Sequence, residues 1–224
     1  RQVALKVLLE GAFAGETARR RFEREVELAA SLRHPCIVTV LDSGGSSGRY
    51  FFAMEFIDGW RLDQYLRESA PTFAEALALF VKICDAVNYA HQRGVIHRDL
   101  KPSNILVDKA GAPHLLDFGL AKSERGGDPR ETTVAMVSTT GQVLGTLAYM
   151  SPEQAAGSID VDVRSDVYSL GVIFYEGLLG RTPYPVDGAL GDILSRIARD
   201  EPLPPRQVRT SSRYGKAIDD EIET

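Results

Sequence analysis

Two polar turns, each preceded by a short apolar run, are the feature that most restricts how this chain can fold. The first is HRDLKPSN at 97–104, after Val95 and Ile96, and the second is DFG at 117–119, after the run HLL. The runs ILV and HLLDF are predicted to be short strands flanking a turn. Ordinary turn roles for aspartate and asparagine would explain one such segment. Two of them, with Asn104 thirteen residues before Asp117, favour a site that binds a hydroxyl, a phosphate and a metal ion.

The side chains of these turns suit that chemistry. Asp99 is a candidate general base that accepts the proton of a hydroxyl group. Lys101 is placed to balance negative charge on a transferred phosphoryl group. Asn104 offers a neutral oxygen, and Asp117 an anionic one, to a hard cation.

The first quarter of the chain is predicted to be rich in strands. We expect a strand at 3–9 and a helix at 16–33, where apolar residues recur at helical spacing. Two β-rich runs then follow, CIVTVLDSG and RYFFAMEF, and the Gly/Ser segment 43–48 between them predicts a hairpin. This pattern indicates a small β-rich lobe over residues 1–57.

From residue 58 onward the pattern is mostly helical. Thr72 and Glu75 form a capping-box pattern before an apolar-periodic helix that runs to Arg93. Further helices are predicted at 165–180 and 189–199, and the Ser/Thr/Gly-rich stretch 123–141 is predicted to be a loop. The second predicted lobe covers residues 58–224.

Lys6 is a charged residue inside an apolar strand. Strand alternation places Ala4 and Lys6 on the same face. A lysine at a strand edge commonly keeps its ammonium group in water. The functional alternative needs a carboxylate nearby, and Glu25 on the following helix is the candidate.

Composition excludes several functional classes. The chain has 224 residues, 44% of them hydrophobic, and a formal net charge of -5, which argues against a nucleic-acid partner. Its two cysteines have neither metal-ligand spacing nor a disulfide framework, so a reducing compartment is the default. No apolar run is long enough to cross a membrane.

The motifs of the chain, taken in order, resemble those of the eukaryotic-type protein kinases. Their residues are similar to those of the bacterial serine/threonine kinases of that family. The motifs, in family order, are VALK, FEREVELAASLRHPCIV, AMEF, HRDLKPSN, DFG, GTLAYMSPE and SDVYSLG. The resemblance implies an α+β, bilobal fold that binds ATP and Mg²⁺ and phosphorylates serine or threonine of protein substrates. It also implies a cytoplasmic kinase domain, with any membrane anchor outside this chain, and it leaves a homodimer for trans-autophosphorylation open.

The resemblance assigns roles to the candidate residues. Asp99 would deprotonate the substrate hydroxyl, Lys101 would contact the transferring phosphoryl group, and Asn104 and Asp117 would hold Mg²⁺. Lys6, oriented by Glu25, would hold the α- and β-phosphates. Thr146 together with Lys101 matches the Ser/Thr-specific pattern, and Asp166 would tie the catalytic-loop backbone to a buried helix. The residues expected around adenine are Ala4, Met54, Glu55, Ile57 and Leu106.

The resemblance also implies a phosphorylation switch. Arg98, Lys122 and Arg21 match positions that can form a cationic pocket for a phosphorylated loop. The candidate phosphosites are Thr140, then Thr139 and Ser138. A flexible Ser/Thr loop without regulatory function is the alternative.

Two expected features are absent from the sequence. No G-x-G-x-x-G loop precedes Lys6, and no arginine in the expected context is available to pair with Glu153. We interpret the chain as a piece of a kinase truncated at both ends, whose activity alone is in doubt. The alternatives are a pseudokinase-like binding or scaffolding module, and a small-molecule kinase. The intact set of Lys6, Asp99, Asn104 and Asp117 argues against the first, and GTLAYMSPE argues against the second.

Overall fold

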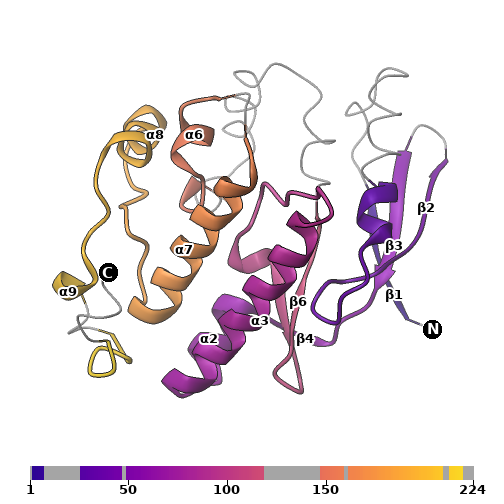
Figure 1. The fold of residues 1–224 in the computed structure, drawn as a ribbon, viewed down its shortest axis with the longest axis horizontal. Coiled ribbons are helices and arrows are strands. Elements are labelled where there is room, and N and C mark those ends of the chain that lie inside the picture. The colour runs from indigo at the N-terminus through magenta and orange to yellow at the C-terminus, as the bar shows by residue number, and fades with distance from the viewer. Residues whose placement is uncertain are drawn as a thin grey trace.

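Two small sheets and a group of helices make up the architecture (Figure 1). The computed structural model describes residues 2–7, 26–46, 49–118, 147–158, 161–208 and 212–218. The first sheet and a short helix at 26–31 lie at one end of the molecule, the helices after residue 150 lie at the other, and the second sheet lies between them (Figure 1). This arrangement is the expected bilobal α+β fold. The exact boundary at residues 57 and 58 stays a prediction.

The first sheet is antiparallel, with strand order β1-β3-β2. Its strands are β1 (Val3–Val7), β2 (Val40–Ser46) and β3 (Arg49–Glu55). The alternation predicted for β1 is present, since Ala4 and Lys6 are half-buried whereas Val3, Leu5 and Val7 are exposed. The hairpin is confirmed, but the predicted turn at 43–48 was too long. The strand continues to Ser46 because Ser43–Ser46 still pair with β3.

Residues 26–31 are helical and bury Val26 and Ala29. The earlier part of the helix predicted at 16–33 lies outside the described residues. Beyond the helix, Ile37 bridges Leu115 in parallel, and the N–H of Val38 donates to the Leu115 carbonyl at 2.9 Å. This short ladder joins the two sheets through the backbone.

The second sheet has the order β4-β5-β6, formed by β4 (Gly59–Arg61), β5 (Ile105–Asp108) and β6 (Pro113–Leu115). The β5 and β6 strands confirm the prediction from ILV and HLLDF. The β4 strand was not predicted because it has only three residues and no alternation to reveal it. A Cβ atom on Gly59 would lie 2.2 Å from the Val107 carbonyl oxygen, so this close strand pairing requires glycine.

Two long helices form the centre of the larger lobe. α3 (Phe73–His91) begins with the predicted capping box of Thr72 and Glu75, and α7 (Val163–Leu179) ends at Gly180 in the left-handed conformation. α8 (Leu190–Arg199) confirms the third predicted helix. The shorter elements are α2 (Leu62–Glu68), η1 (Pro102–Asn104), α6 (Pro152–Ala155) and α9 (Pro205–Val208).

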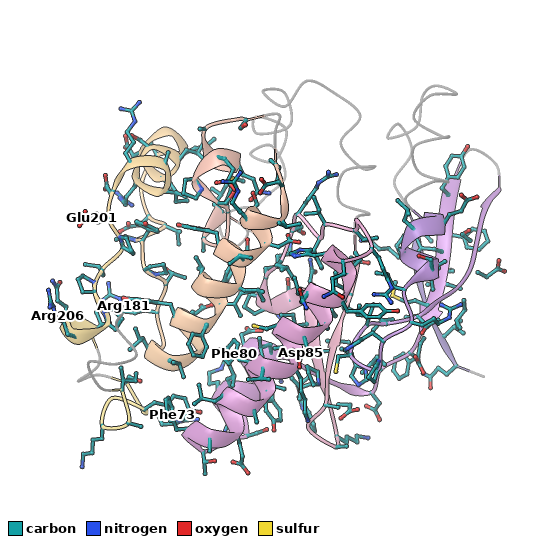
Figure 2. The ribbon with its side chains drawn as sticks, in the orientation of Figure 1. Phe73, Phe80, Asp85, Arg181, Glu201 and Arg206 are labelled. Carbon is teal, nitrogen blue, oxygen red and sulfur yellow. The ribbon has the colours of Figure 1, made fainter. Side chains whose placement is uncertain are left out.

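The core of the larger lobe lies between α3 and α7. Phe80 extends from α3 (Figure 2) and meets Phe174 of α7 edge to face, with ring centroids 4.8 Å apart. One face of α7 is buried, including Asp166 and Ile173, whereas Val167 is 59% exposed. The buried face of α7 carries Asp166 toward the segment 97–104 and thereby positions the candidate site.

Candidate active site

A buried aspartate fixes the backbone of the first polar turn. Asp166 on α7 is only 1% exposed, and its two carboxylate oxygens accept the N–H groups of His97 and Arg98, each at 2.8 Å. These are the bonds required by the prediction that Asp166 ties the turn to a buried helix. Burial raises the pKa of Asp166, but hydrogen bonds from His91 and from these two amides outweigh that effect and lower it. The carboxylate therefore stays ionised in the core.

His97 connects the first polar turn to the second. Its Nδ1 accepts the N–H of Asp99 at 3.3 Å, and its Nε2 lies 2.8 Å from the carbonyl oxygen of Leu116. Since an amide N–H can only donate and a carbonyl can only accept, these contacts assign the acceptor role to Nδ1 and the donor role to Nε2. The ring, with an exposed fraction of 0%, is a packed connector between the turns.

Two polar residues that follow Asp99 in the turn contact it. Lys101 Nζ lies 2.9 Å from Asp99 Oδ2. The side-chain nitrogen of Asn104 donates to the backbone carbonyl of Asp99 at 2.8 Å and to its Oδ2 at 3.2 Å. The turn thus brings a carboxylate, an ammonium group and an amide together, as the sequence pattern predicted. The amide nitrogen of Asn104 is engaged with Asp99, so its oxygen is the atom left for another ligand.

A side chain of the second polar turn contacts strand β1 of the first sheet. Lys6 Nζ on β1 forms an ion pair with Asp117 Oδ2 at 2.9 Å, across 111 positions of the sequence. Asp117 adopts a φ of 59°, in the left-handed region that side chains other than glycine seldom occupy. Its other oxygen, Oδ1, is buried and has no hydrogen-bond partner among the described residues. A buried carboxylate oxygen without a donor is costly unless a ligand satisfies it.

The donors at this site suit a magnesium ion. No group of three or more His, Cys, Asp or Glu side chains in the described parts of the chain could hold a metal by itself. Mg²⁺ is commonly held by one or two protein oxygens and completes its shell with water and phosphate oxygens. The Oδ1 of Asp117 and the amide oxygen of Asn104 meet that requirement.

Three of the five residues predicted to surround adenine lie at one small apolar cluster. Met54 is buried with Val26, Val38 and Phe52, and Ala4 and Ile57 pack against this group. A small cavity runs from Met54 to Asp117. Glu55 is half-buried at the end of β3, and Leu106 is half-buried in β5. The structure therefore brings Ala4, Met54 and Ile57 into one apolar cluster, of which Met54 lines a cavity shared with Asp117. The role of these residues in binding adenine stays a prediction.

Several predicted residues lie outside the described part of the chain: Arg21, Glu25, Lys122, Ser138, Thr139, Thr140 and Thr146. Arg98 is described. It has a φ of 68°, and its buried Nε finds no hydrogen-bond partner within the described ranges.

Two further contacts that support the first polar turn were not predicted, one with its backbone and one with Asp166. Gln154 of α6 donates from Nε2 to the carbonyl of Arg98 at 2.9 Å, and His91 Nε2 lies 2.7 Å from Asp166 Oδ2. A lone histidine at a helix end, such as His91, carries no functional signal in the sequence. For Gln154, the capping-box spacing from Ser151 predicts a helix start and says nothing about Arg98.

The hydrogen-bond partner of Glu153 could not be predicted from the sequence either. Glu153 Oε1 accepts a hydrogen bond from the hydroxyl of Ser165 on α7, which together with other hydrogen bonds outweighs burial and lowers its pKa. The arginines considered as partners of Glu153 were Arg206, Arg209 and Arg213, and Arg209 lies outside the described residues. Arg213 instead donates to the carbonyls of Leu66 and Arg67. Figure 2 shows Arg206 on α9, at the edge of the larger lobe.

Comparison of the sequence with known proteins shows which family the chain belongs to. The protein kinase domain matches residues 1–216. The chain is 38% identical over 203 residues to the probable serine/threonine-protein kinase PknB of Lactococcus lactis, which covers 90% of this chain and 31% of that protein. It is 38% identical over 210 residues to the serine/threonine-protein kinase PknB of Mycolicibacterium smegmatis, with 92% and 32% covered.

A third relative covers the whole chain. The serine/threonine-protein kinase PrkC of Bacillus subtilis is 35% identical over 224 residues, which is 100% of this chain and 32% of that protein. The chain thus spans about a third of the length of the curated relatives it matches. No helix within the described residues is long and apolar enough to cross a membrane. The match over residues 1–216 shows that the chain belongs to the protein kinase domain family.

Proposed function

We propose that the whole protein transfers a phosphoryl group from ATP to serine or threonine hydroxyls of protein substrates, with Mg²⁺ as cofactor. The observation that carries this proposal is the state of Asp117. One of its oxygens is paired with Lys6, and the other is buried without a donor among the described residues. A carboxylate in that state suits a cation bound beside a lysine that holds phosphate groups.

The residues of the catalytic turn have distinct tasks in this proposal. Asp99 orients the substrate hydroxyl and accepts its proton, and Asn104 fixes the Asp99 carboxylate by donating to it. Lys101, 2.9 Å from Asp99, supplies positive charge where negative charge develops. Catalysis therefore depends on positioning and electrostatics and needs no covalent bond to the protein.

Lys6 and Asp117 act on the nucleotide and its metal ion in this proposal. Bound Mg²⁺ would neutralise phosphate charge, held by Asn104 and Asp117. Lys6 would contact the α- and β-phosphates, and Glu25 would orient it. Ala4, Met54, Glu55, Ile57 and Leu106 would enclose adenine, and Thr146 would belong to the peptide-binding segment.

The loop switch extends this proposal. Phosphate on Thr140, Thr139 or Ser138 would be bound by a cationic pocket of Arg98, Lys122 and Arg21. The buried Nε of Arg98, which has no hydrogen-bond partner among the described residues, supports an acidic ligand at that place. Mapping phosphosites after incubation with ATP tests the switch, and a Thr139→Ala/Thr140→Ala variant with undiminished activity would rule it out.

The proposal is tested on the full-length protein with Asp99→Asn. Transfer to protein substrate should fall by about 10²- to 10⁴-fold, the usual contribution of a general base, while ATP binding is retained. Asp108→Asn, an aspartate in a hairpin of the same lobe, is the control and should leave transfer unchanged. Equal turnover in Asp99→Asn would end the assignment. ATP binding without transfer by the wild-type protein would favour the pseudokinase alternative.

A further inference from the structure

We infer that Gln154, on α6, is a positioning residue for phosphoryl transfer, because it holds the carbonyl of Arg98, the residue immediately before Asp99 in the catalytic turn (97–104). This inference rests on the proposed function. Gln154 Nε2 donates to the Arg98 carbonyl at 2.9 Å, and Gln154 Oε1 accepts the N–H of Ser151 at 3.0 Å. Because a backbone N–H can only donate and a carbonyl can only accept, these two partners fix which end of the side-chain amide faces the turn.

A second capping box in the chain shows why an amide matters at this position. At the start of α3, Glu75 accepts the N–H of Thr72 at 2.8 Å, so a carboxylate serves as the cap there. At the start of α6, the cap needs only the side-chain oxygen of Gln154, and its Nε2 faces a carbonyl. A carboxylate in this place would turn an acceptor toward that carbonyl and repel it. The contact with Arg98, and not the cap, therefore explains why glutamine rather than glutamate suits this position.

The bond to Gln154 matters because the backbone of Arg98 is strained. Arg98 has a φ of 68°, a conformation that a residue with a Cβ atom keeps only where its surroundings enforce it. Its N–H is held by Asp166 Oδ1 at 2.8 Å and its carbonyl is held by Gln154, so the peptide groups on both sides of Arg98 are fixed. If the carbonyl is released, the peptide group between Arg98 and Asp99 can rotate. The Asp99 side chain would then move away from the substrate hydroxyl.

Gln154 also connects two parts of the lobe that α7 holds separately. Asp166 binds the catalytic turn, whereas Ser169, on the same helix, donates to the carbonyl of Tyr149 at 2.7 Å. Both of these α7 side chains are buried. The segment 147–153, which contains Tyr149, belongs to the motif assigned to peptide binding in the proposed function. The hydrogen bond from Gln154 is a direct link between that segment and the turn, so it sets where Asp99 lies relative to a bound peptide.

The experiment compares Gln154→Glu with Gln154→Met in the full-length protein, because both lack the donor and their other effects differ. Gln154→Glu keeps the oxygen that caps α6 but adds a charge, whereas Gln154→Met stays neutral but loses the cap. We expect kcat to fall by about fivefold to fiftyfold in both variants, with KM for ATP changed less than about threefold. The control is Glu75→Met, which removes the matching cap of α3 and should keep kcat within about twofold of wild type.

A second measurement does not depend on activity. Amide hydrogen exchange of Arg98 and Asp99 should accelerate in both Gln154 variants, whereas exchange of Ser151 should accelerate in Gln154→Met only. Exchange at these amides thus separates a change in the turn from a change in the cap. If the wild-type protein transfers no phosphate, the proposed function fails, and exchange at Arg98 and Asp99 still decides whether Gln154 positions the turn.

The inference is overturned by any result that separates the loss of transfer from the missing donor. Unchanged kcat in both Gln154 variants would be such a result, whether or not exchange accelerates. A loss of kcat in Gln154→Glu alone would assign the effect to the added charge, and a loss in Gln154→Met alone would assign it to the missing cap. An equal loss in Glu75→Met would assign it to helix capping in general.

Discussion

The two sides of the candidate site are held in place by different means. The catalytic turn at 97–104 rests on buried groups, with His97 and Asp166 at 0% and 1% exposure. On the other side, Lys6 projects from β1, a strand whose opposite face is exposed at Val3, Leu5 and Val7. Lys6 reaches the turn residues through its ion pair with Asp117, and its side chain is 33% exposed.

Because of this difference, substitutions on the two sides should differ in how much they change the stability of the protein relative to its activity. Groups beneath the catalytic turn satisfy buried backbone amides, so their loss should unfold the lobe as well as stop the reaction. A half-exposed lysine on a strand contributes little to folding, so its loss should affect the reaction alone. Substitutions on the two sides of the site test that separation.

The largest effect is expected for Asp166→Ala. The substitution leaves the N–H groups of His97 and Arg98 buried without acceptors, which should lower the free energy of unfolding by about 2–5 kcal/mol and abolish transfer. Denaturant unfolding followed by circular dichroism measures the loss. A loss below about 1 kcal/mol would show that the turn does not depend on this carboxylate.

The lowered pKa of Asp166 adds a pH dependence to this prediction. A carboxyl group whose pKa is lower in the folded state stabilises the fold fully above its unfolded value, about 3.9. That stabilisation disappears as pH falls through the folded pKa. The stability difference between wild type and Asp166→Asn should therefore be constant from neutral pH down to that range and then shrink. A difference that grows on acidification would contradict the assigned sign.

The second prediction concerns Lys6→Met. Transfer should fall by at least about a hundredfold because a positive charge at the phosphates is lost, while the free energy of unfolding changes by less than about 0.5 kcal/mol. Lys109→Met is the control, since Lys109 also pairs with an aspartate, Asp58, at an exposed position. Steady-state kinetics and denaturant unfolding of both variants decide the matter. A large stability loss in Lys6→Met would show that the two sides of the site are held alike.

The sequence predicted which polar side chains lie close together better than it predicted the residues that support them. Asp99, Asn104 and Asp117 lie in turns whose composition is unusual, so their proximity could be predicted from two short strands joined by a turn. The pairing of Lys6 with Asp117 could not, because it depends on how the small sheet meets the larger lobe. The sequence suggested Glu25 as the partner of Lys6, and Glu25 lies outside the described residues.

The sequence gives little indication of which residues on distant helices support the turn at 97–104. His91 and Gln154 resemble ordinary helix-end residues, and only the packing of α3, α6 and α7 brings them to the catalytic turn. Strand β4 was missed because three residues show no periodicity. The long helices were predicted well because capping residues and apolar spacing are local properties of the chain.

The third prediction tests the packing of the helix that carries Asp166. A Cβ atom on Gly177 would lie 2.9 Å from Phe80 Cζ and 3.1 Å from Leu66 Cδ1, whereas one on Gly171 would have nothing within 4 Å. We expect Gly177→Ala to destabilise the protein by about 1–2 kcal/mol through overpacking. Gly171→Ala should stabilise it by up to about 1 kcal/mol through helix propensity. Thermal unfolding of the two variants compares them directly, and equal shifts would show that α7 is not tightly packed against α3.

The smallest effect is expected for Glu176→Gln, in the same helix. Burial raises the pKa of Glu176, although the hydroxyl of Tyr149 donates a hydrogen bond to it. A carboxyl group with a raised pKa destabilises the fold when it is charged, so Glu176→Gln should raise the free energy of unfolding near pH 7 by less than about 1 kcal/mol. The amide oxygen of Gln still accepts from Tyr149, which keeps the local geometry. As pH falls through the folded pKa toward the unfolded value of about 4.3, the wild-type carboxyl becomes protonated and the gain should vanish. Denaturant unfolding from pH 4 to 8 measures it, and a loss of stability near pH 7 would instead show that the charge of Glu176 supports the fold, as the charge of Asp166 does.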